Sequence, residues 1–367
     1  MIPVRAAPRL LRHLVARISG VALLALSAMS PAIAGQTKMD KKLNAAVLAG
    51  ELPGLHATIA EFRGARLTEV YFKGEDETWG RPLGSVQHGP ETLHDLRSVT
   101  KSIVGLLYGI ALEDGLVPPV TAPLLAQFPA YADLAGDPLR DQITVEHALT
   151  LSMGATWNEN LPYSDPRNSE IAMEQAPDRY RFVLEQPMEA APGSKWTYSG
   201  GAVALIGKLI ADGVGMPIDD FAKARLFDPL GITRFEWIAG ADGVPSVASG
   251  LRLTANDLTK IGNMIDNNGV ADGQIIVPAA WLDASFTSRA EVGGGVRYGY
   301  LWYIFGSEER PVIFAAGNGG QRLTVQPSVD LVVTSFAGNY NQPDAWHIPL
   351  RVMRDFVVPD VTQRLKK

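Results

Sequence analysis

The chain has 367 residues, of which 46% are hydrophobic and 20% are charged, as in a soluble globular protein with one large core or two coupled lobes. Its formal net charge of −6 makes it a poor candidate for nucleic-acid binding, and we expect no nucleic-acid partner. It contains no cysteine, which excludes disulfides, a thiol nucleophile and zinc–thiolate sites.

Residues 1–34 have the pattern of a signal peptide. A basic region without acidic residues precedes a short apolar run at 21–29, and 32–34 has the small-x-small pattern of a cleavage site. The apolar run is too short to span a bilayer, and no later segment is long and apolar enough. We therefore expect an exported protein, periplasmic or secreted, with no stable membrane anchor after cleavage. Loss of four arginines would change its net charge from −6 to −10.

Two strands are predicted at 55–62 and 66–72, because apolar residues partly alternate along both runs. Residues 74–95 are rich in Gly, Pro and charge and are expected to form a loop. The apolar run 102–112, preceded by the segment 98–101, then predicts a buried helix, and Gly115 suits the left-handed residue after its end.

From about 115 to 240, helical segments are broken by Pro and Gly, at 144–149, 202–211 and 218–226. Three β-rich runs follow, with short connections that favour antiparallel pairing, at 311–316, 321–326 and 331–336. An amphipathic helix is predicted at 346–357.

Strands near both ends of the chain and helices in its middle predict an α+β fold with two lobes. An antiparallel five-stranded sheet flanked by helices would be built from residues 35–115 and 241–367. A mostly helical lobe would be formed by residues 116–240. We expect the active site in the seam between the lobes, a common place for pockets.

Ser98 and Lys101 lie three residues apart at the start of the predicted helix, so they share a face at its N-terminal end. A serine hydroxyl becomes a good nucleophile when a base takes its proton, and a lysine can be that base if burial lowers its pKa. The N-terminal end of a helix also favours developing negative charge. The alternative is a serine cap followed by a surface lysine on the first turn.

A second motif, residues 192–200, places Tyr198 on irregular backbone just before a helix. A phenol near a lysine amine can share its proton and act as base and then as acid. The alternative is a tyrosine whose ring packs in the core.

A third motif, residues 317–321, follows an apolar strand and is rich in glycine. Such a strand can offer a backbone N–H to an oxyanion, and glycine lets substrate approach closely. A simple hairpin turn explains the same residues, and both interpretations can hold together.

In this order, the motifs resemble those of the serine β-lactamase and penicillin-binding-protein superfamily, most of all its class C, esterase and 6-aminohexanoate-oligomer hydrolase branch. The resemblance covers residues 45–360 and implies a β-lactamase/transpeptidase-like fold. It implies that Ser98 forms an acyl-enzyme with a small amide or ester substrate, that Lys101 and Tyr198 move the proton, and that the N–H groups of Ser98 and Asn318 hold the oxyanion. It implies no metal and no organic cofactor.

Two departures from that family pattern bear on the substrate. The tyrosine motif ends in Gly200, where β-lactamases have Asn, and the third motif has Ala315 in place of its lysine. These losses favour an amide or ester other than a β-lactam. β-Lactamase or D,D-peptidase activity is the first alternative, and a penicillin-recognising binding module without turnover is the second.

The remaining candidates carry weaker signals. Tyr163 resembles a substrate-facing tyrosine of the oligomer-hydrolase branch, although its Pro-rich segment also suits a solvated loop. Gly317 and Gly319 are further candidate substrate contacts. His94 and His147 have no partner at metal-ligand spacing and are expected to be structural. Arg97 either braces its loop or meets an acidic substrate, and the glycine-rich segment 285–300 is a candidate lid.

Overall fold

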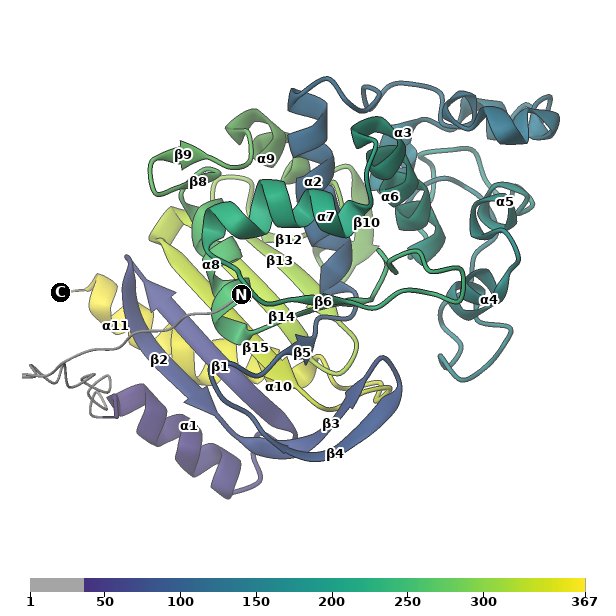
Figure 1. Ribbon diagram of the computed structural model, residues 1–367. Helices are drawn as coiled ribbons and strands as arrows, with labels where there is room; N and C mark the ends of the chain where they lie inside the picture. The colour runs from purple at the N-terminus through teal and green to yellow at the C-terminus, as the bar shows by residue number, and fades with distance from the viewer. Residues whose placement is uncertain (1–35, 367) are drawn as a thin grey trace, which may run out of the picture. The chain divides into compact units, whose positions relative to one another are not determined.

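An eight-stranded antiparallel sheet organises the computed structural model, which describes residues 36–366 (Figure 1). The predicted five strands are all present, but the sheet has eight, so the predicted number is wrong. Its strands, in spatial order, are β10 (Ala290–Gly293), β11 (Val296–Tyr298), β12 (Tyr303–Gly306), β13 (Pro311–Gly317), β14 (Gln321–Gln326), β15 (Leu331–Ala337), β1 (Leu55–Phe62) and β2 (Ala65–Tyr71). The added strands have only three or four residues each, too short for an alternating pattern to stand out.

The two faces of this sheet bury two separate apolar clusters. Successive side chains of a strand point to opposite faces, so a strand covered on both sides can contribute to both clusters. On β15, Val332 belongs to the larger cluster and Val333 to the smaller one, and on β1 Ile59 and Ala60 divide in the same way. This is why β1 and β15 are buried almost throughout instead of alternating between buried and exposed residues.

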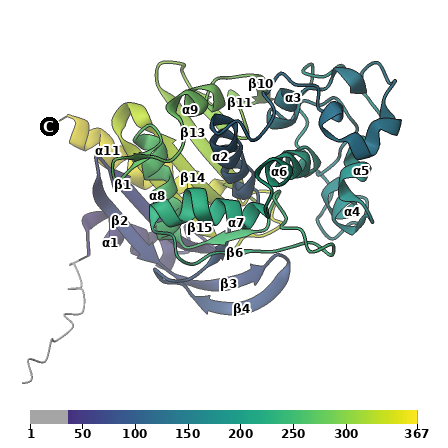
Figure 2. The same cartoon turned by 45° about the horizontal axis from the view of Figure 1, so that its top comes forward.

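Helices cover both faces (Figures 1 and 2). On one face α2 (Val99–Glu113) packs on β13 and β14, and α8 (Ala255–Asp266) packs on β14, β15 and β1. On the other face α1 (Lys38–Leu48) contacts β2, and α10 (His347–Arg351) contacts β15. A π-helical stretch at Val352–Val357 continues α10 into α11 (Val358–Leu365). The predicted amphipathic helix at 346–357 therefore lies where expected.

In residues 116–240 the regular structure is helical, as predicted, apart from the two-residue strand β6 (Glu236–Trp237). Their helices are α3 (Val145–Leu149), α4 (Ser169–Gln175), α5 (Arg179–Leu184), α6 (Gly200–Val214) and α7 (Ile218–Ala222). The long helix α6 packs against α2 and also against α3, α4 and α5, so it joins this region to the helix that begins at Ser98. Within residues 36–366 no single helix is long and apolar enough to cross a membrane. Only α6 and the segment Ile218–Leu230 taken together reach that length and apolar character, and they are bent by 75° relative to each other.

Two predicted loops are strands instead. Residues 74–95 contain a hairpin of β3 (Lys73–Thr78) and β4 (Arg81–Gln87), and the candidate lid at 285–300 contains the paired strands β10 and β11. Both hairpins turn on glycine with positive φ, and their polar sequences hid the strand pattern.

The short elements are β5 (His94–Asp95), β6 (Glu236–Trp237), β7 (Leu251–Leu253), β8 (Val270–Ala271), β9 (Gln274–Ile275) and α9 (Ala279–Ser285). The predicted signal peptide, residues 1–34, lies outside the described residues. Residues 36–366 form one compact unit, and the predicted division into two lobes stays a prediction.

Candidate active site

Ser98 stands at the junction between strand β5 and helix α2. Strand β5 is held by antiparallel pairing with β7, and Arg97 then turns the chain in the left-handed region, with φ of 49°. Ser98 is the N-cap residue of α2, yet its side chain makes no capping hydrogen bond. The hydroxyl is therefore available to other partners at the end of the helix, where the backbone dipoles favour negative charge.

Lys101 lies one helical turn later and is almost fully buried, with 1% exposure. Its Nζ donates to Ser98 Oγ at 3.2 Å and to the carbonyl oxygen of Ala248 at 2.9 Å. Glu170 Oε2 lies 3.8 Å from the same nitrogen. The surface-lysine alternative is therefore wrong, because this amine is held inside the protein and directed at the serine.

Tyr198 comes from the irregular segment before α6, where Ser199 caps the helix by accepting from the Ala202 N–H. The Tyr198 ring centre lies 4.9 Å from Lys101 Nζ. Burial and then the charge of Glu159 raise the pKa of Tyr198 well above its ordinary value, while a side-chain contact with Ser98 acts in the opposite direction. The structure thus brings the serine, the lysine and the tyrosine together, as predicted from three separate stretches of sequence.

A pair of carboxyl groups, Glu159 and Glu170, completes the polar surroundings of Lys101, and sequence reasoning missed it. Glu159 Oε1 accepts from the Gly200 N–H at 2.5 Å and from Trp157 Nε1 at 2.6 Å. Burial and the neighbouring Glu170 raise the pKa of Glu159 to about 8. The carboxyl group of Glu159 therefore keeps its proton at neutral pH. Sequence reasoning missed the pair because Glu159 lies in a Pro-rich loop and Glu170 in the short helix α4, and no sequence motif links two glutamates eleven residues apart.

This pair accounts for the glycine at the end of the tyrosine motif. A Cβ atom on Gly200 would lie 2.8 Å from Glu170 Oε2 and 3.1 Å from the Ala248 Cβ. The carboxylate of Glu170 therefore occupies the space that any longer residue would need at this position. At the other departure, Ala315 is buried in the core of the sheet.

A cavity of about 590 Å³ opens on Ser98 and is lined by residues from several distant segments. Asn318, the second predicted oxyanion residue, and Tyr163 both line it. The Tyr163 hydroxyl donates to Glu159 Oε2 at 3.3 Å, which places this tyrosine between the cavity and the carboxyl pair. Tyr198 lines a smaller cavity of about 220 Å³, together with Glu159.

The two glycines predicted as substrate contacts have another role in the structure. A Cβ on Gly317 would lie 2.3 Å from the Leu96 carbonyl oxygen, and one on Gly319 would lie 2.6 Å from the Tyr340 ring. Their missing side chains let these protein segments approach each other, and their assignment as substrate contacts stays a prediction. Asn318 between them is the residue that faces the cavity.

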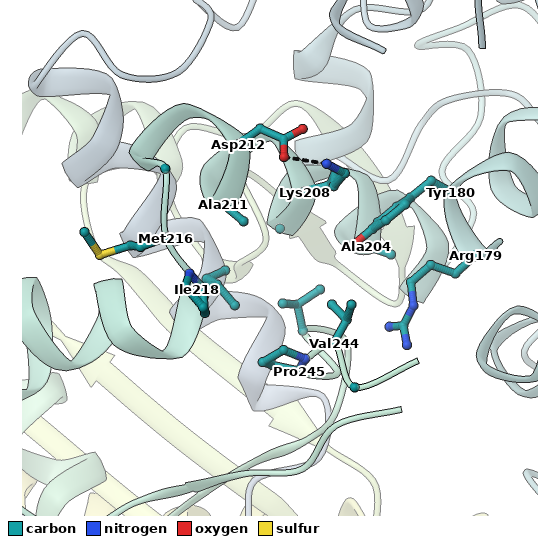
Figure 3. A pocket seen from close by; sticks show the side chains of 15 residues that line it. Arg179, Tyr180, Ala204, Lys208, Ala211, Asp212, Met216, Ile218, Val244 and Pro245 are labelled. Carbon is teal, nitrogen blue, oxygen red and sulfur yellow. Dashed lines mark hydrogen bonds and ion pairs between the residues drawn. The ribbon is translucent and has the colours of Figure 1, made fainter. Parts of the chain in front are cut away.

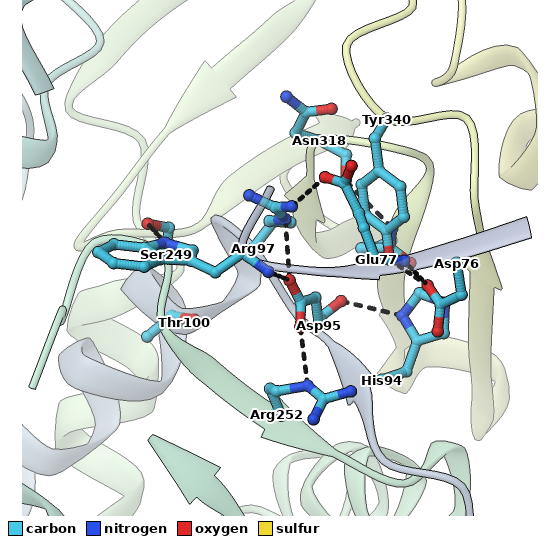
Figure 4. Close-up of polar contacts among 12 residues, drawn as sticks. Asp76, Glu77, His94, Asp95, Arg97, Thr100, Ser249, Arg252, Asn318 and Tyr340 are labelled. Carbon is cyan, nitrogen blue, oxygen red and sulfur yellow. Dashed lines mark hydrogen bonds and ion pairs between the residues drawn. The ribbon is translucent and has the colours of Figure 1, made fainter. Parts of the chain in front are cut away.

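Arg97 braces its own loop (Figure 4). Its guanidinium pairs with Glu77 and, at 3.2 Å, with Asp95, and it lies over the Tyr340 ring at 4.9 Å. Two carboxylates pair with this cation, so the structure favours the interpretation that Arg97 braces its loop over the one that it meets an acidic substrate.

A separate cavity of about 570 Å³ lies beside α6 and contains none of the three predicted catalytic residues (Figure 3). Its wall is mostly apolar, and Lys208 and Asp212 form an ion pair at its edge. No reacting group of the kind found at Ser98 lines it among the described residues.

The two histidines expected to be structural differ from each other. His147 Nδ1 accepts from the Thr144 N–H at 3.0 Å and so completes the N-terminal cap of α3. His94 does have partners suited to metal binding, because His56, Asp76 and His88 lie around it. Sequence spacing could not reveal these partners, because they come from four separate segments of the chain.

The fold and the site together define the class of protein as a serine hydrolase of β-lactamase/transpeptidase-like architecture. A family profile described as beta-lactamase matches residues 50–345. The chain belongs to the beta-lactamase family.

Similar proteins include hydrolases of amides and esters. The chain is 24% identical over 285 residues to 6-aminohexanoate-dimer hydrolase of Paenarthrobacter ureafaciens, a match that covers 70% of this chain and 69% of that protein. It is 27% identical over 217 residues to lovastatin esterase of Penicillium rubens, covering 53% of this chain and 51% of that protein. A Bacillus anthracis structure assigned as a 6-aminohexanoate-dimer hydrolase superimposes with a TM-score of 0.71 at 17% identity, covering 87% of this chain and 82% of that one. At that identity the likeness shows the fold alone.

Proposed function

We propose that the chain hydrolyses an amide or ester bond of a small molecule through an acyl-enzyme formed on Ser98. The observation that carries the proposal is the hydrogen bond from Lys101 Nζ to Ser98 Oγ, 3.2 Å long, at the floor of a cavity and beside the Tyr198 ring. A nucleophile, a buried amine and a phenol in mutual contact form the arrangement that activates a serine.

In the proposed reaction Ser98 Oγ attacks the carbonyl carbon while its proton passes to the Lys101–Tyr198 pair. The backbone N–H groups of Ser98 and Asn318 stabilise the oxyanion of the tetrahedral intermediate. Tyr198 then protonates the leaving amine or alcohol, and the acyl group stays on Ser98. A water molecule, deprotonated by the same pair, releases the acid and restores the serine.

The cavity wall supports the substrate class. Each of its three acidic residues has a cationic partner: Glu77 pairs with Arg97, Glu170 lies 3.8 Å from Lys101 Nζ, and Glu174 pairs with Arg179. The aromatic residues Trp79 and Tyr163 also line the wall. Among the described lining residues no unpaired cation is available to bind the carboxylate of a β-lactam, so the wall suits an uncharged amide or ester better.

Kinetics on chromogenic substrates tests the proposal. We expect turnover of a nitrophenyl ester or anilide and little turnover of a chromogenic cephalosporin. Ser98→Ala is expected to lower kcat/KM by about 10³-fold or more, and Tyr198→Phe by about 10²-fold or more. Ser194→Ala, which removes an exposed hydroxyl from the same motif region, is the matched control and should leave kcat/KM unchanged.

Mass spectrometry with a fluorophosphonate probe separates the alternatives. The folded wild-type chain should gain one adduct that Ser98→Ala lacks. If the fluorophosphonate leaves Ser98 of the folded protein unmodified, the enzyme proposal is wrong. A substrate adduct that clears supports hydrolysis, whereas a permanent one supports the binding module.

We also propose that the chain is exported and cleaved after residue 34, from the pattern of its first residues. Expression of the full chain in a bacterium, followed by fractionation and N-terminal sequencing, tests this. Gly35 as the new N-terminus of a periplasmic or secreted product is the expected result. An uncleaved chain in the cytoplasm contradicts it.

A further inference from the structure

Four potential metal ligands from four separate segments converge in the interior next to the β3–β4 hairpin. They are three imidazoles and one carboxylate, contributed by His56 on β1, Asp76 on β3, His88 just after β4 and His94 on β5. One ligand atom of each lies within 4.8 Å of those of the other three, and all four residues are at most 5% exposed. Half of the chain's six histidines therefore meet at one buried point.

One hydrogen bond joins two of these imidazoles, from His56 Nδ1 to His94 Nε2, and several other polar atoms of the cluster have no hydrogen-bond partner. His94 Nδ1 donates to the Asp95 carbonyl oxygen at 3.0 Å, which fixes its tautomer and leaves a lone pair on Nε2. That Nε2 lies 2.9 Å from His56 Nδ1 and 3.7 Å from Asp76 Oδ1. His56 Nε2, His88 Nε2 and Asp76 Oδ2 are buried without a hydrogen-bond partner. Unpartnered buried lone pairs are costly, and a cation satisfies several of them at once.

The charges of the four groups also suit a cation. Burial lowers the pKa of His56 to about 3 and that of His94 to about 4, and it lowers the pKa of His88. Neutral imidazole is the form that binds metal ions, and an unperturbed histidine is already mostly neutral at pH 7. Asp76 is buried, which opposes its ionisation, but His94 and a hydrogen bond from the Tyr340 hydroxyl bring its pKa below its ordinary value.

Partners outside the cluster hold the ligands in place (Figure 4). The Tyr340 hydroxyl donates to Asp76 Oδ1 at 2.9 Å, and the Asp95 carbonyl orients the His94 ring. Such outer contacts to a carboxylate and to the second nitrogen of an imidazole accompany metal ligands in general.

We propose that His56, Asp76, His88 and His94 form a buried structural site for one divalent transition-metal ion of the zinc type. Nitrogen and oxygen donors suit zinc, and four protein ligands with no open position are typical of a structural site. Zinc–ligand bonds of about 2.1 Å set tetrahedral edges of about 3.4 Å, so small side-chain rotations bring the ligands together.

The ion would join the β3–β4 hairpin to the main sheet. Its ligands link β1 and β3 to β5, and β5 leads directly into Ser98. The hairpin supplies Glu77 and Trp79 to the cavity that opens on Ser98. The site would thus fix the position of one cavity wall without any contact with substrate.

Metal binding is tested on the full chain, purified without a histidine tag, stripped with a chelator and given zinc or cobalt(II). We expect about one ion per chain by elemental analysis after desalting, a visible absorption band typical of tetrahedral cobalt(II), and a higher melting temperature with zinc. Uptake of less than about 0.1 ion per chain in excess zinc would overturn the proposal and leave a hydrogen-bonded histidine cluster.

Variants locate the bound ion. His88→Gln should lower zinc uptake at least about tenfold and remove the zinc-dependent rise in melting temperature. The conservative Asp76→Asn provides the same test if His88→Gln does not fold. His347→Gln, at an exposed histidine outside the cluster, is the matched control and should keep one ion. Equal uptake by wild type and by the folded cluster variant would overturn the proposal.

Discussion

Two carboxyl groups, those of Glu159 and Glu170, lie beside Lys101, and Glu159 keeps its proton at neutral pH. The Gly200 and Trp157 N–H groups both donate to Glu159, whereas Ser249 Oγ donates to Glu170 at 2.8 Å. Glu159 therefore holds the backbone at the start of α6, directly after Tyr198, and Glu170 faces the amine. These contacts hold the backbone next to Tyr198 and place a carboxyl group beside the Lys101 amine.

The raised pKa of Glu159 predicts a pH dependence of stability. Between about pH 4.5 and pH 8 the folded chain keeps this proton and the unfolded chain loses it, so stability falls as pH rises through that window. Glu159→Gln mimics the protonated form and should flatten this fall in melting temperature. The exposed Glu308→Gln is the control and should follow the wild type. A Glu159→Gln profile that parallels the wild type over this range contradicts the assignment.

Among individual residues, the sequence predicted those that belong to a short local motif. Ser98 and Lys101 share one helical turn, and Tyr198 has a turn motif before it, so each was found. Glu159, Glu170 and the histidine cluster depend on contacts between distant segments. No periodic pattern encodes such contacts.

Among the elements, α2 shows how glycine sets the distance between a helix and its neighbour. A Cβ on Gly109 would lie 2.0 Å from Trp281 Cδ1, and Trp281 Nε1 donates to the Gly105 carbonyl at 2.9 Å. The indole therefore packs directly on the helix backbone and helps to fix the helix that carries Ser98 and Lys101.

Gly109→Ala should destabilise the protein, although alanine favours helices by about 1 kcal/mol. Overpacking against the indole should cost about 1–3 kcal/mol and outweigh that gain. Denaturant unfolding measures the difference. Gly89→Ala, at a glycine with no atom within 4 Å of the added Cβ, is the control and should have a small effect. A Gly109→Ala protein as stable as the wild type would show that the packing can relax.

Long apolar elements were predicted well and polar ones poorly. Strands β13 and β15 and the helix α2 carry long apolar runs. The β3–β4 hairpin has six or seven mostly polar residues per strand and covers no large core, so its composition suggested a loop.

For the whole molecule, the larger apolar cluster extends from the sheet into the helical region. It includes Ile59 of β1 and Leu323 of β14 together with Leu205 of α6 and Val145 of α3. A shared core couples the two predicted lobes, because neither can lose its packing alone.

We therefore expect the mature chain to unfold in one cooperative transition. Calorimetric and van't Hoff enthalpies should agree, and far-UV and near-UV circular dichroism should give one midpoint. Two separated transitions would show that residues 116–240 unfold independently of the sheet.

The pairing of β1 with β15 has a consequence for synthesis of the chain. Leu55 to Phe62 find their neighbours on one side only when Leu331 to Ala337 have been made. Until then a nascent chain exposes one long apolar edge, the kind of edge that invites association with other chains. A chain that ends before β15 would therefore contain Ser98 but would not fold into an active enzyme. Such a truncated chain would also be prone to aggregate.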